Sequence, residues 1–429
     1  MAYIHRTNGT ATNELIWTLS MWVKQSDPEW GAMLAGAAGA TNTPEFSITG
    51  ADVLQFWTAS ATAYLATTAK YRDPSAWRHI VIAVDTTQGT PADRIKMYVN
   101  GEEPALTTAT YPSASYNSEL NKSGEVIEIG KTGPNPLNGV LSHVHFIDGI
   151  QYTASTFGET DATSGIWKIK TSPTVTYGNN GFFLKMEDRT NLDLDSSPNA
   201  HTMTTSGTIT ATYDNPSNNF CTWNPLDNYR QGAAFAYGNT QFTTTTTAES
   251  WNSGTLGVAS GKWYWEVQGD MFGIAGLMTD GNTGTYYLGN KTDTWGYYVD
   301  GKLWNSGSGT AWGATHNTTD IMAVALDLDN NFLYLAKNNV WQNSGVPTSG
   351  ATGTGAITVI APSSGFYYPA NGDYGGSAVI CTGNFGNGYF GTTAVTSAEA
   401  DGAGIGAFEY APPTGYYALC TKNIKAYGG

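Results

Sequence analysis

The sequence predicts an all-β protein built from two antiparallel β-sandwich domains. Three observations support this prediction: short runs of alternating apolar and polar residues, turn residues at the end of each run, and almost no helical periodicity. Glycine accounts for 51 of the 429 residues, and threonine, serine and asparagine fill the same stretches, as is typical of strands joined by tight turns. The length fits two sandwiches of roughly 200 residues each.

Composition and charge exclude several classes of protein. Hydrophobic residues make up 40% of the chain and include 14 tryptophans, which is enough for buried cores and excludes global disorder. Only 13% of the residues are charged and the net charge is −15, with no basic patch, so neither nucleic-acid binding nor attachment to an anionic membrane is expected. No basic segment followed by an apolar run opens the chain, so we expect no signal peptide and no membrane insertion.

The first half contains the clearest alternating strands. Trp17, Leu19, Met21 and Val23 point to one side of a single strand. A single helical turn is expected near 153–157. The other strands expected here are 78–84, 94–99 ending in an Asn-Gly turn, 126–129 and 140–147. We expect a first sandwich over 1–181.

A connector over 182–222, rich in Asn, Asp, Ser and Pro, is expected to complete the first sandwich. Alternation predicts strands at 181–186 and 208–213 within this part of the chain. The second sandwich then spans 223–429. Its expected strands are 241–247, 262–267, 272–277, 295–299, 321–327 and 332–336.

Both halves resemble known families through the order of their motifs. The order LSMWVK, WRHIVIAVD, RIKMYVNGE and NGVLSHVHFIDG, between Trp17 and Phe157, resembles the concanavalin A-like or laminin-G-like jelly roll. The second half, with GKWYWEV, FGIAGL, WGYYVDGKLWNSG and APPTGYYALCTKNI, resembles a SPRY domain, and more narrowly the SPRY domains of tailed-phage structural proteins.

The resemblance implies a non-enzymatic virion protein of a phage. It implies a tail fibre, another appendage or a receptor-recognition component, with a capsid decoration protein as the alternative. The implied partners are other virion proteins and a host-surface glycan, and a homo-oligomer is expected. The implied location is the virion, assembled in the host cytoplasm. Two other classes stay open: a glycan-cleaving jelly-roll enzyme and an intracellular adaptor that binds a peptide through SPRY loops.

Acidic residues do not form a pattern that predicts an enzyme. A retaining glycosidase needs two carboxylates about 5 to 5.5 Å apart, which on one strand requires acidic residues two apart. Glu125 and Glu128 point to opposite faces, and Glu102 and Glu103 follow a turn, so all four are expected to be solvated. Through the laminin-G-like resemblance, Asp193 and Asp195 become candidates for a structural Ca²⁺, and no other cofactor is expected.

Histidines and cysteines are expected to be structural. His143 and His145 share one face of a strand but lack a third metal ligand, so satisfied polar partners are expected. Three cysteines without a CxxC spacing indicate neither a zinc site nor a disulfide framework, and a single disulfide bond stays open.

Aromatic residues near glycine-rich loops of the second half are the best functional candidates. Aromatic rings stack on sugar rings, and loops at the rim of a sandwich often carry binding residues. Trp304 and Trp312 flank the stretch 305–311, which is expected to be flexible, and Tyr286, Tyr287 and Trp295 lie near a second such loop. We therefore predict ligand contacts from these five side chains.

Overall fold

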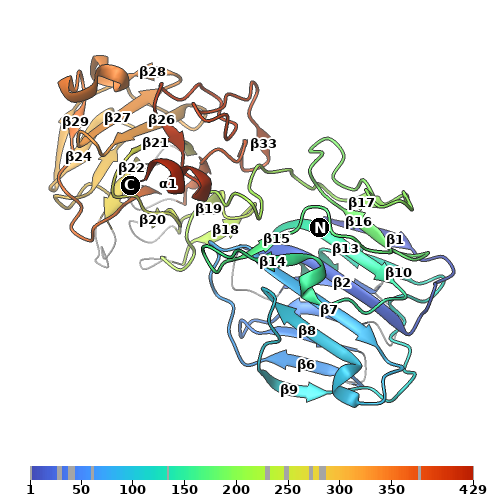
Figure 1. Cartoon of the computed structure of the whole chain (residues 1–429). Coiled ribbons are helices and arrows are strands. Elements are labelled where there is room, and N and C mark those ends of the chain that lie inside the picture. The colour runs from blue at the N-terminus through green and yellow to red at the C-terminus, as the bar shows by residue number, and fades with distance from the viewer. Residues whose placement is uncertain are drawn as a thin grey trace. The chain divides into compact units, whose positions relative to one another are not determined.

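The computed structural model is all-β with antiparallel sheets, which confirms the predicted fold class (Figure 1). It divides into two compact units, Met1–Ala211 and Thr212–Gly429. Within the described residues no helix is long and apolar enough to span a membrane. The described residues are 2–26, 31–36, 44–58, 62–132, 135–227, 232–245, 251–269, 274–279, 287–374 and 378–428.

The first unit is a sandwich of an eight-stranded and a five-stranded sheet. The eight-stranded sheet has the order β17 (Thr204–Ser206), β1 (Tyr3–Thr7), β10 (Val126–Ile129), β3 (Gly31–Gly36), β4 (Glu45–Ile48), β5 (Leu54–Trp57), β6 (Tyr64–Thr67), β9 (Leu106–Thr110). The five-stranded sheet has the order β16 (Phe182–Leu184), β13 (Gly139–Asp148), β2 (Ile16–Gln25), β7 (Arg78–Asp85), β8 (Ile95–Val99).

The core of the first unit lies between these two sheets. The alternating residues Trp17, Leu19, Met21 and Val23 of β2 all face it, as predicted. The Trp17 indole nitrogen is satisfied by donating to Ser118 Oγ at 3.1 Å, because a buried polar group needs a partner. The opposite sheet contributes side chains such as Phe46, so the inner faces of both sheets form this core.

The outer face of the five-stranded sheet is covered by the segment that follows β13. This segment holds the 3₁₀ turn η3 (Ala154–Thr156) and the paired strands β14 (Gly158–Thr160) and β15 (Trp167–Ile169). Phe157 and Ala154 pack there against Val81 and Ile147. The expected helical turn is therefore present, and it shields this face from water.

Three histidines lie buried on this covered face. The His145 ring stacks on Phe183 with centroids 3.8 Å apart and bonds with Tyr177 Oη at 3.0 Å. A β-bulge between Ser142 and His145 gives His143 a φ of 49°, and its Nδ1 bonds with Ser142 Oγ at 2.7 Å. Burial lowers the pKa of His143 to about 4 and that of His79 to about 3.

The connector adds strands to both sheets of the first unit. β16 pairs with β13, and β17 pairs with β1. The prediction of a strand over 208–213 is wrong, because that stretch has no regular secondary structure. The strand that pairs with β1 is Thr204–Ser206 instead. The units divide after Ala211, earlier than the boundary expected at 222, because Phe220 already bridges to Cys420 in the second unit.

The second unit is also a sandwich of two sheets. Its nine-stranded sheet has the order β18 (Ala234–Ala236), β19 (Gln241–Thr243), β31 (Ile380–Asn384), β21 (Lys262–Gly269), β26 (Ile321–Asp327), β27 (Phe332–Lys337), β28 (Val340–Trp341), with β29 (Ile357–Thr358) on β27 and β34 (Tyr417–Ala418) on β21. Its six-stranded sheet has the order β20 (Trp251–Ser253), β30 (Tyr367–Gly372), β22 (Ile274–Thr279), β23 (Trp295–Tyr297), β24 (Lys302–Asn305), β25 (Ser308–Ala311).

Most strands predicted for the second half occur in these sheets. Within the stretch 241–247, β19 ends at Thr243, and residues 246 and 247 lie outside the described residues. Residues 272 and 273, the start of the strand predicted over 272–277, also lie outside the described residues, and β22 begins at Ile274. The three cysteines are buried and free.

A buried carboxylate ties a late segment of the chain to the nine-stranded sheet. Glu266 on β21 is fully buried and accepts bonds from the backbone nitrogens of Glu409 and Tyr410 at 2.9 and 2.8 Å. Tyr264 Oη and Asn384 Nδ2 donate to it as well, at 3.0 and 3.1 Å. Burial raises the pKa of Glu266 to about 7, although these donors oppose the shift.

Candidate functional site

Four aromatic side chains meet on the outer face of the six-stranded sheet in the second unit. We define them as the aromatic patch: Tyr287, Tyr298, Trp304 and Tyr374. Strand alternation places two of them there, because Tyr297 and Leu303 face the core while their neighbours Tyr298 and Trp304 face outward.

The rings of the aromatic patch contact one another. Tyr287 lies edge-on to Trp304 and to Tyr374, with centroids 5.5 and 5.0 Å apart. The Trp304 ring is 5.4 Å from Tyr298 and is stacked with Tyr374 at 6.4 Å. Tyr374 is 51% exposed, so the patch presents an aromatic surface to solvent above a buried base.

Two neighbours fix the base of the patch. Tyr298 donates its hydroxyl proton to the carbonyl of Leu288 at 3.1 Å. Gly309 lies across the Trp304 indole so closely that a Cβ there would come within 2.4 Å of the ring. The Trp304 indole nitrogen is buried and has no hydrogen-bond partner in the described structure. The nitrogen is therefore not accessible to a ligand, and the patch offers aromatic faces suited to a ligand with an apolar face.

The structure separates the five predicted contact residues. Tyr287 and Trp304 lie in the aromatic patch, and their contact with a ligand stays a prediction. Trp312 packs edge-on against Tyr297 at 5.5 Å on the core side, because the stretch expected to be flexible is the tight hairpin β24–β25. The structure corrects the expectation for Trp295, because this side chain is 4% exposed and belongs to the core. Tyr286 lies outside the described residues.

Sequence reasoning missed two members of the patch. Tyr298 follows Tyr297 in the run Trp295 to Val299, and its outward direction follows from strand alternation. Tyr374 comes from the distant end of β30, after Asp373. Only the pairing of β22 with both β23 and β30 brings these segments together, and a single sequence does not reveal this pairing.

The carboxylates of the two candidates for a calcium site already accept hydrogen bonds from the protein. Asp195 is buried and accepts from the backbone nitrogens of Phe183, Ser197 and His201 at 2.9, 2.9 and 2.8 Å. Asp193 accepts from Thr205 Oγ1 at 2.7 Å. Within the described ranges no group of three or more His, Cys, Asp or Glu side chains is placed to hold a metal ion.

Ser20 and His79 lie close together but do not form a nucleophile with its base. Ser20 Oγ is 2.9 Å from His79 Nε2, and Trp167 donates its indole proton to His79 Nδ1 at 3.0 Å. The neutral ring therefore carries its proton on Nε2 and donates it to Ser20. With a pKa lowered by burial to about 3, this ring does not activate the serine.

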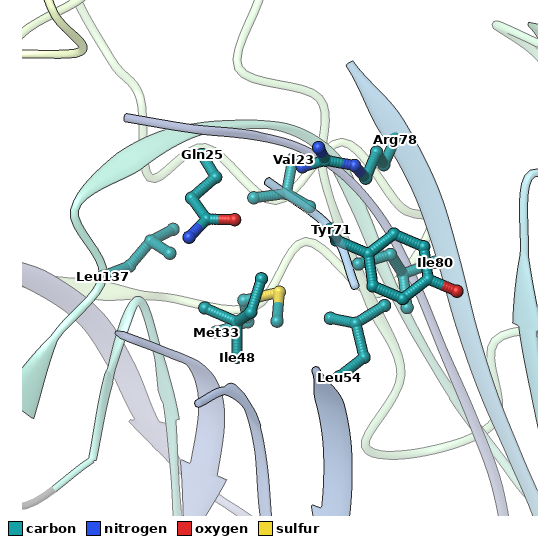
Figure 2. Close-up of a pocket in the computed structure, with 9 residues that line it drawn as sticks. All are labelled: Val23, Gln25, Met33, Ile48, Leu54, Tyr71, Arg78, Ile80 and Leu137. Carbon is teal, nitrogen blue, oxygen red and sulfur yellow. The ribbon is translucent and has the colours of Figure 1, made fainter. Parts of the chain in front are cut away.

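A small cavity opens between the sheets of the first unit (Figure 2). Met33, Leu54 and Ile80 form its apolar wall, and Gln25 and Arg78 contribute polar atoms. Its empty volume is about 260 Å³ with the solvent at its mouth included, so the enclosed space is smaller than this. Arg78 is held by the carbonyl of Asp73 at 2.6 Å, so we assign this cavity no ligand.

Comparison with known proteins supports the concanavalin A-like fold of the first unit. Residues 2–151 match the family described as the concanavalin A-like lectin/glucanases superfamily. No curated protein matches the sequence.

Solved structures similar to this chain include SPRY domains. The SPRY domain of human HERC1 has 13% identity and a TM-score of 0.30, covering 38% of this chain and 96% of that one. The TRIM65 PSpry domain has 15% identity and a TM-score of 0.29, covering 38% and 90%. The heptameric SAP-like pentraxin from Limulus polyphemus has 13% identity and a TM-score of 0.29, covering 36% and 73%.

Proposed function

With a concanavalin A-like first unit as the premise, we propose that this chain is a non-enzymatic carbohydrate-binding protein. The observation that carries the proposal is the aromatic patch, whose ring Tyr374 is exposed while Trp304 lies fixed beneath it. Sugar rings offer apolar C–H faces that stack on such aromatic rings.

We propose further that the chain is a virion component of a tailed phage, in a tail fibre or another appendage. The resemblance of the second half to phage SPRY domains supports this. The low charge of the chain, 13% charged residues, suits contacts with other virion subunits through neutral hydrogen bonds. Immunogold labelling of purified particles tests the location: label on fibres or at the tail tip agrees with the proposal, and label over the head or on no particle contradicts it.

Binding by the aromatic patch is tested with Tyr374→Ala on an array of bacterial surface polysaccharides, followed by calorimetry on the glycans that bind. One stacked ring contributes about 0.5 to 1.5 kcal/mol, so we expect affinity to fall about 2- to 10-fold. Tyr237→Ala is the matched control, because Tyr237 is 47% exposed in the same unit but outside the patch. Equal affinity of both variants and the parent protein would contradict the proposal.

A further inference from the structure

The outer face of the eight-stranded sheet in the first unit carries a row of polar and aromatic side chains that no single strand reveals. The strand registers pair His5 with Glu128, Glu128 with Ala35, and Ala35 with Glu45. The same row continues from Glu45 to Trp57 and from Trp57 to Tyr64. We define the carboxylate row as His5, Glu128, Glu45, Trp57 and Tyr64.

Strand alternation directs the carboxylate row away from the core. Ile127 and Ile129 on either side of Glu128 belong to the core cluster, as do Phe46 and Phe56 beside Glu45 and Trp57. Glu128 and Glu45 therefore share the outer face, with one strand between them, which sets their backbones about 9 to 10 Å apart.

Both carboxylates are buried and incompletely satisfied. Glu45 and Glu128 are each 5% exposed. Oε1 of Glu45 and Oε2 of Glu128 have no hydrogen-bond partner among the described residues. The prediction of a solvated Glu128 is therefore wrong, because neighbouring groups remove its water without replacing every hydrogen bond. Buried acceptors without donors are costly, so a ligand that displaces the groups covering these oxygens and donates protons to both of them removes this cost.

The charges in the carboxylate row favour a ligand with one positive charge. Lys131 Nζ lies 3.1 Å from Glu128 Oε1 and 3.9 Å from the centre of the Tyr3 ring, so one carboxylate is already neutralised. Within the described residues Glu45 has no ion-pair partner, and Trp57 is its neighbour in the sheet. A carboxylate beside an indole ring is a suitable place for an ammonium group, through charge attraction and cation–π contact.

Neutral hydrogen-bonding groups extend the row on its aromatic side. Gln55 Nε2 donates to Ser47 Oγ at 3.0 Å, and Tyr64 Oη donates to Gln55 Oε1 at 3.3 Å. Trp57 and Tyr64 are only partly buried, so this side is open to solvent. Aromatic rings beside amides and hydroxyls are suited to the alternating C–H faces and hydroxyls of a saccharide.

We propose that the carboxylate row is a second ligand site, and that it binds a saccharide bearing a protonated amine. The ammonium group lies between Glu45 and Trp57, and hydroxyls of the neighbouring sugar donate to Glu128 Oε2. This inference is independent of the aromatic patch, because it depends on other residues in the other unit.

The test is calorimetric titration of the full chain with a glucosamine tetrasaccharide and with its N-acetylated counterpart. We expect the amine form to bind and the acetylated form, which has no positive charge, to bind at least about 10-fold more weakly. Equal affinity for both forms would overturn the proposal, and so would equal binding of tetralysine, which has the charge without the sugar.

Two substitutions locate the binding in the carboxylate row. Glu45→Gln keeps the shape of the side chain and should weaken binding of the amine form at least about 10-fold, while raising the thermal midpoint because an unpaired buried charge is removed. Trp57→Phe reports on the same site without a change in charge, and should weaken binding and abolish the ligand-induced change in tryptophan fluorescence. Glu102→Gln, at an exposed position in a turn of the same unit, is the control.

Three further results would overturn the proposal. They are full binding by Glu45→Gln, a loss of binding in Glu102→Gln equal to that in Glu45→Gln, and release of new reducing ends from the tetrasaccharide. The last result would make the two carboxylates a catalytic pair. Tyr374→Ala should bind the amine form normally, so failure of the aromatic patch and failure of the carboxylate row give different results.

Discussion

The buried histidines of the first unit should make that unit sensitive to acid. Burial lowers the pKa of His79 to about 3, whereas in the unfolded chain it stays near 6.5. The unfolded state therefore takes up the proton first, so the stabilisation is complete above pH 6.5 and is lost as the pH falls towards 3. At pH 4.5 the loss from His79 alone is about 3 kcal/mol, because each pH unit crossed below 6.5 costs about 1.4 kcal/mol.

The substitution His79→Phe removes the titrating group while keeping an aromatic ring between Trp22 and Trp167. It should cost about 1 to 3 kcal/mol at pH 7.5, because the indole proton of Trp167 loses its acceptor. Hydrogen exchange in β2 and β7 of the full chain, measured at pH 7.5 and 4.5 and corrected for intrinsic rates, gives the free energy of opening. The parent protein should lose about 3 kcal/mol more than the variant between the two pH values.

The second unit provides an internal control for this experiment. Exchange in β21 and β26 should be the same in the parent protein and in His79→Phe. An equal loss of stability in β2 and β7 of both proteins would refute the conclusion that His79 is buried in its neutral form.

Three further predictions concern other residues. Burial raises the pKa of Glu266 to about 7, so the free energy of unfolding of the second unit should fall by about 3 kcal/mol as the pH rises from 4.5 through 7. Hydrogen exchange of residues 407–410 should show a smaller fall in Glu266→Gln. Gly309→Ala should displace Trp304, lower stability by about 1 to 3 kcal/mol and weaken glycan binding, as measured by thermal melting and calorimetry. Asp195→Ala should lower the thermal midpoint much more than Asp193→Ala, because three backbone donors lose their acceptor, whereas a chelator should not change the midpoint of the parent protein.

Strands with one face in the core were predictable from the sequence, because burial imposes a period of two. β2 shows this pattern clearly, whereas β7 is apolar on both faces because Val81 and Ala83 pack under the covering segment. The prediction over 208–213 failed because alternation alone does not make a strand: a ladder also needs a partner, and β1 pairs with Thr204–Ser206.

Parts of the candidate sites depend on pairing between distant strands. In the hairpin β24–β25, Trp304 pairs with Gly309 and Lys302 with Ala311. Trp312 therefore lies opposite Gly301. Because Gly301 comes three residues before Trp304, and an odd separation along a strand reverses the face, the indoles of Trp312 and Trp304 lie on opposite faces. Glu45 and Glu128 lie on strands that are not adjacent in the sequence, so their common row appears only when the registers of β10, β3 and β4 are known.

The way in which the second unit is closed by its own ends has a mechanical consequence. Phe220 bridges antiparallel to Cys420, Cys221 N donates to Leu419 O at 2.9 Å, and Thr421 N donates to Asn219 O at 2.8 Å. The segment entering the unit and the segment leading to α1 (Thr421–Tyr427) therefore leave this ladder on the same side. Tension applied between residue 212 and α1 loads these bonds one after another, as in a zipper, and not all at once in shear. The second unit should therefore begin to open from its termini at low force, while its sheets are still intact.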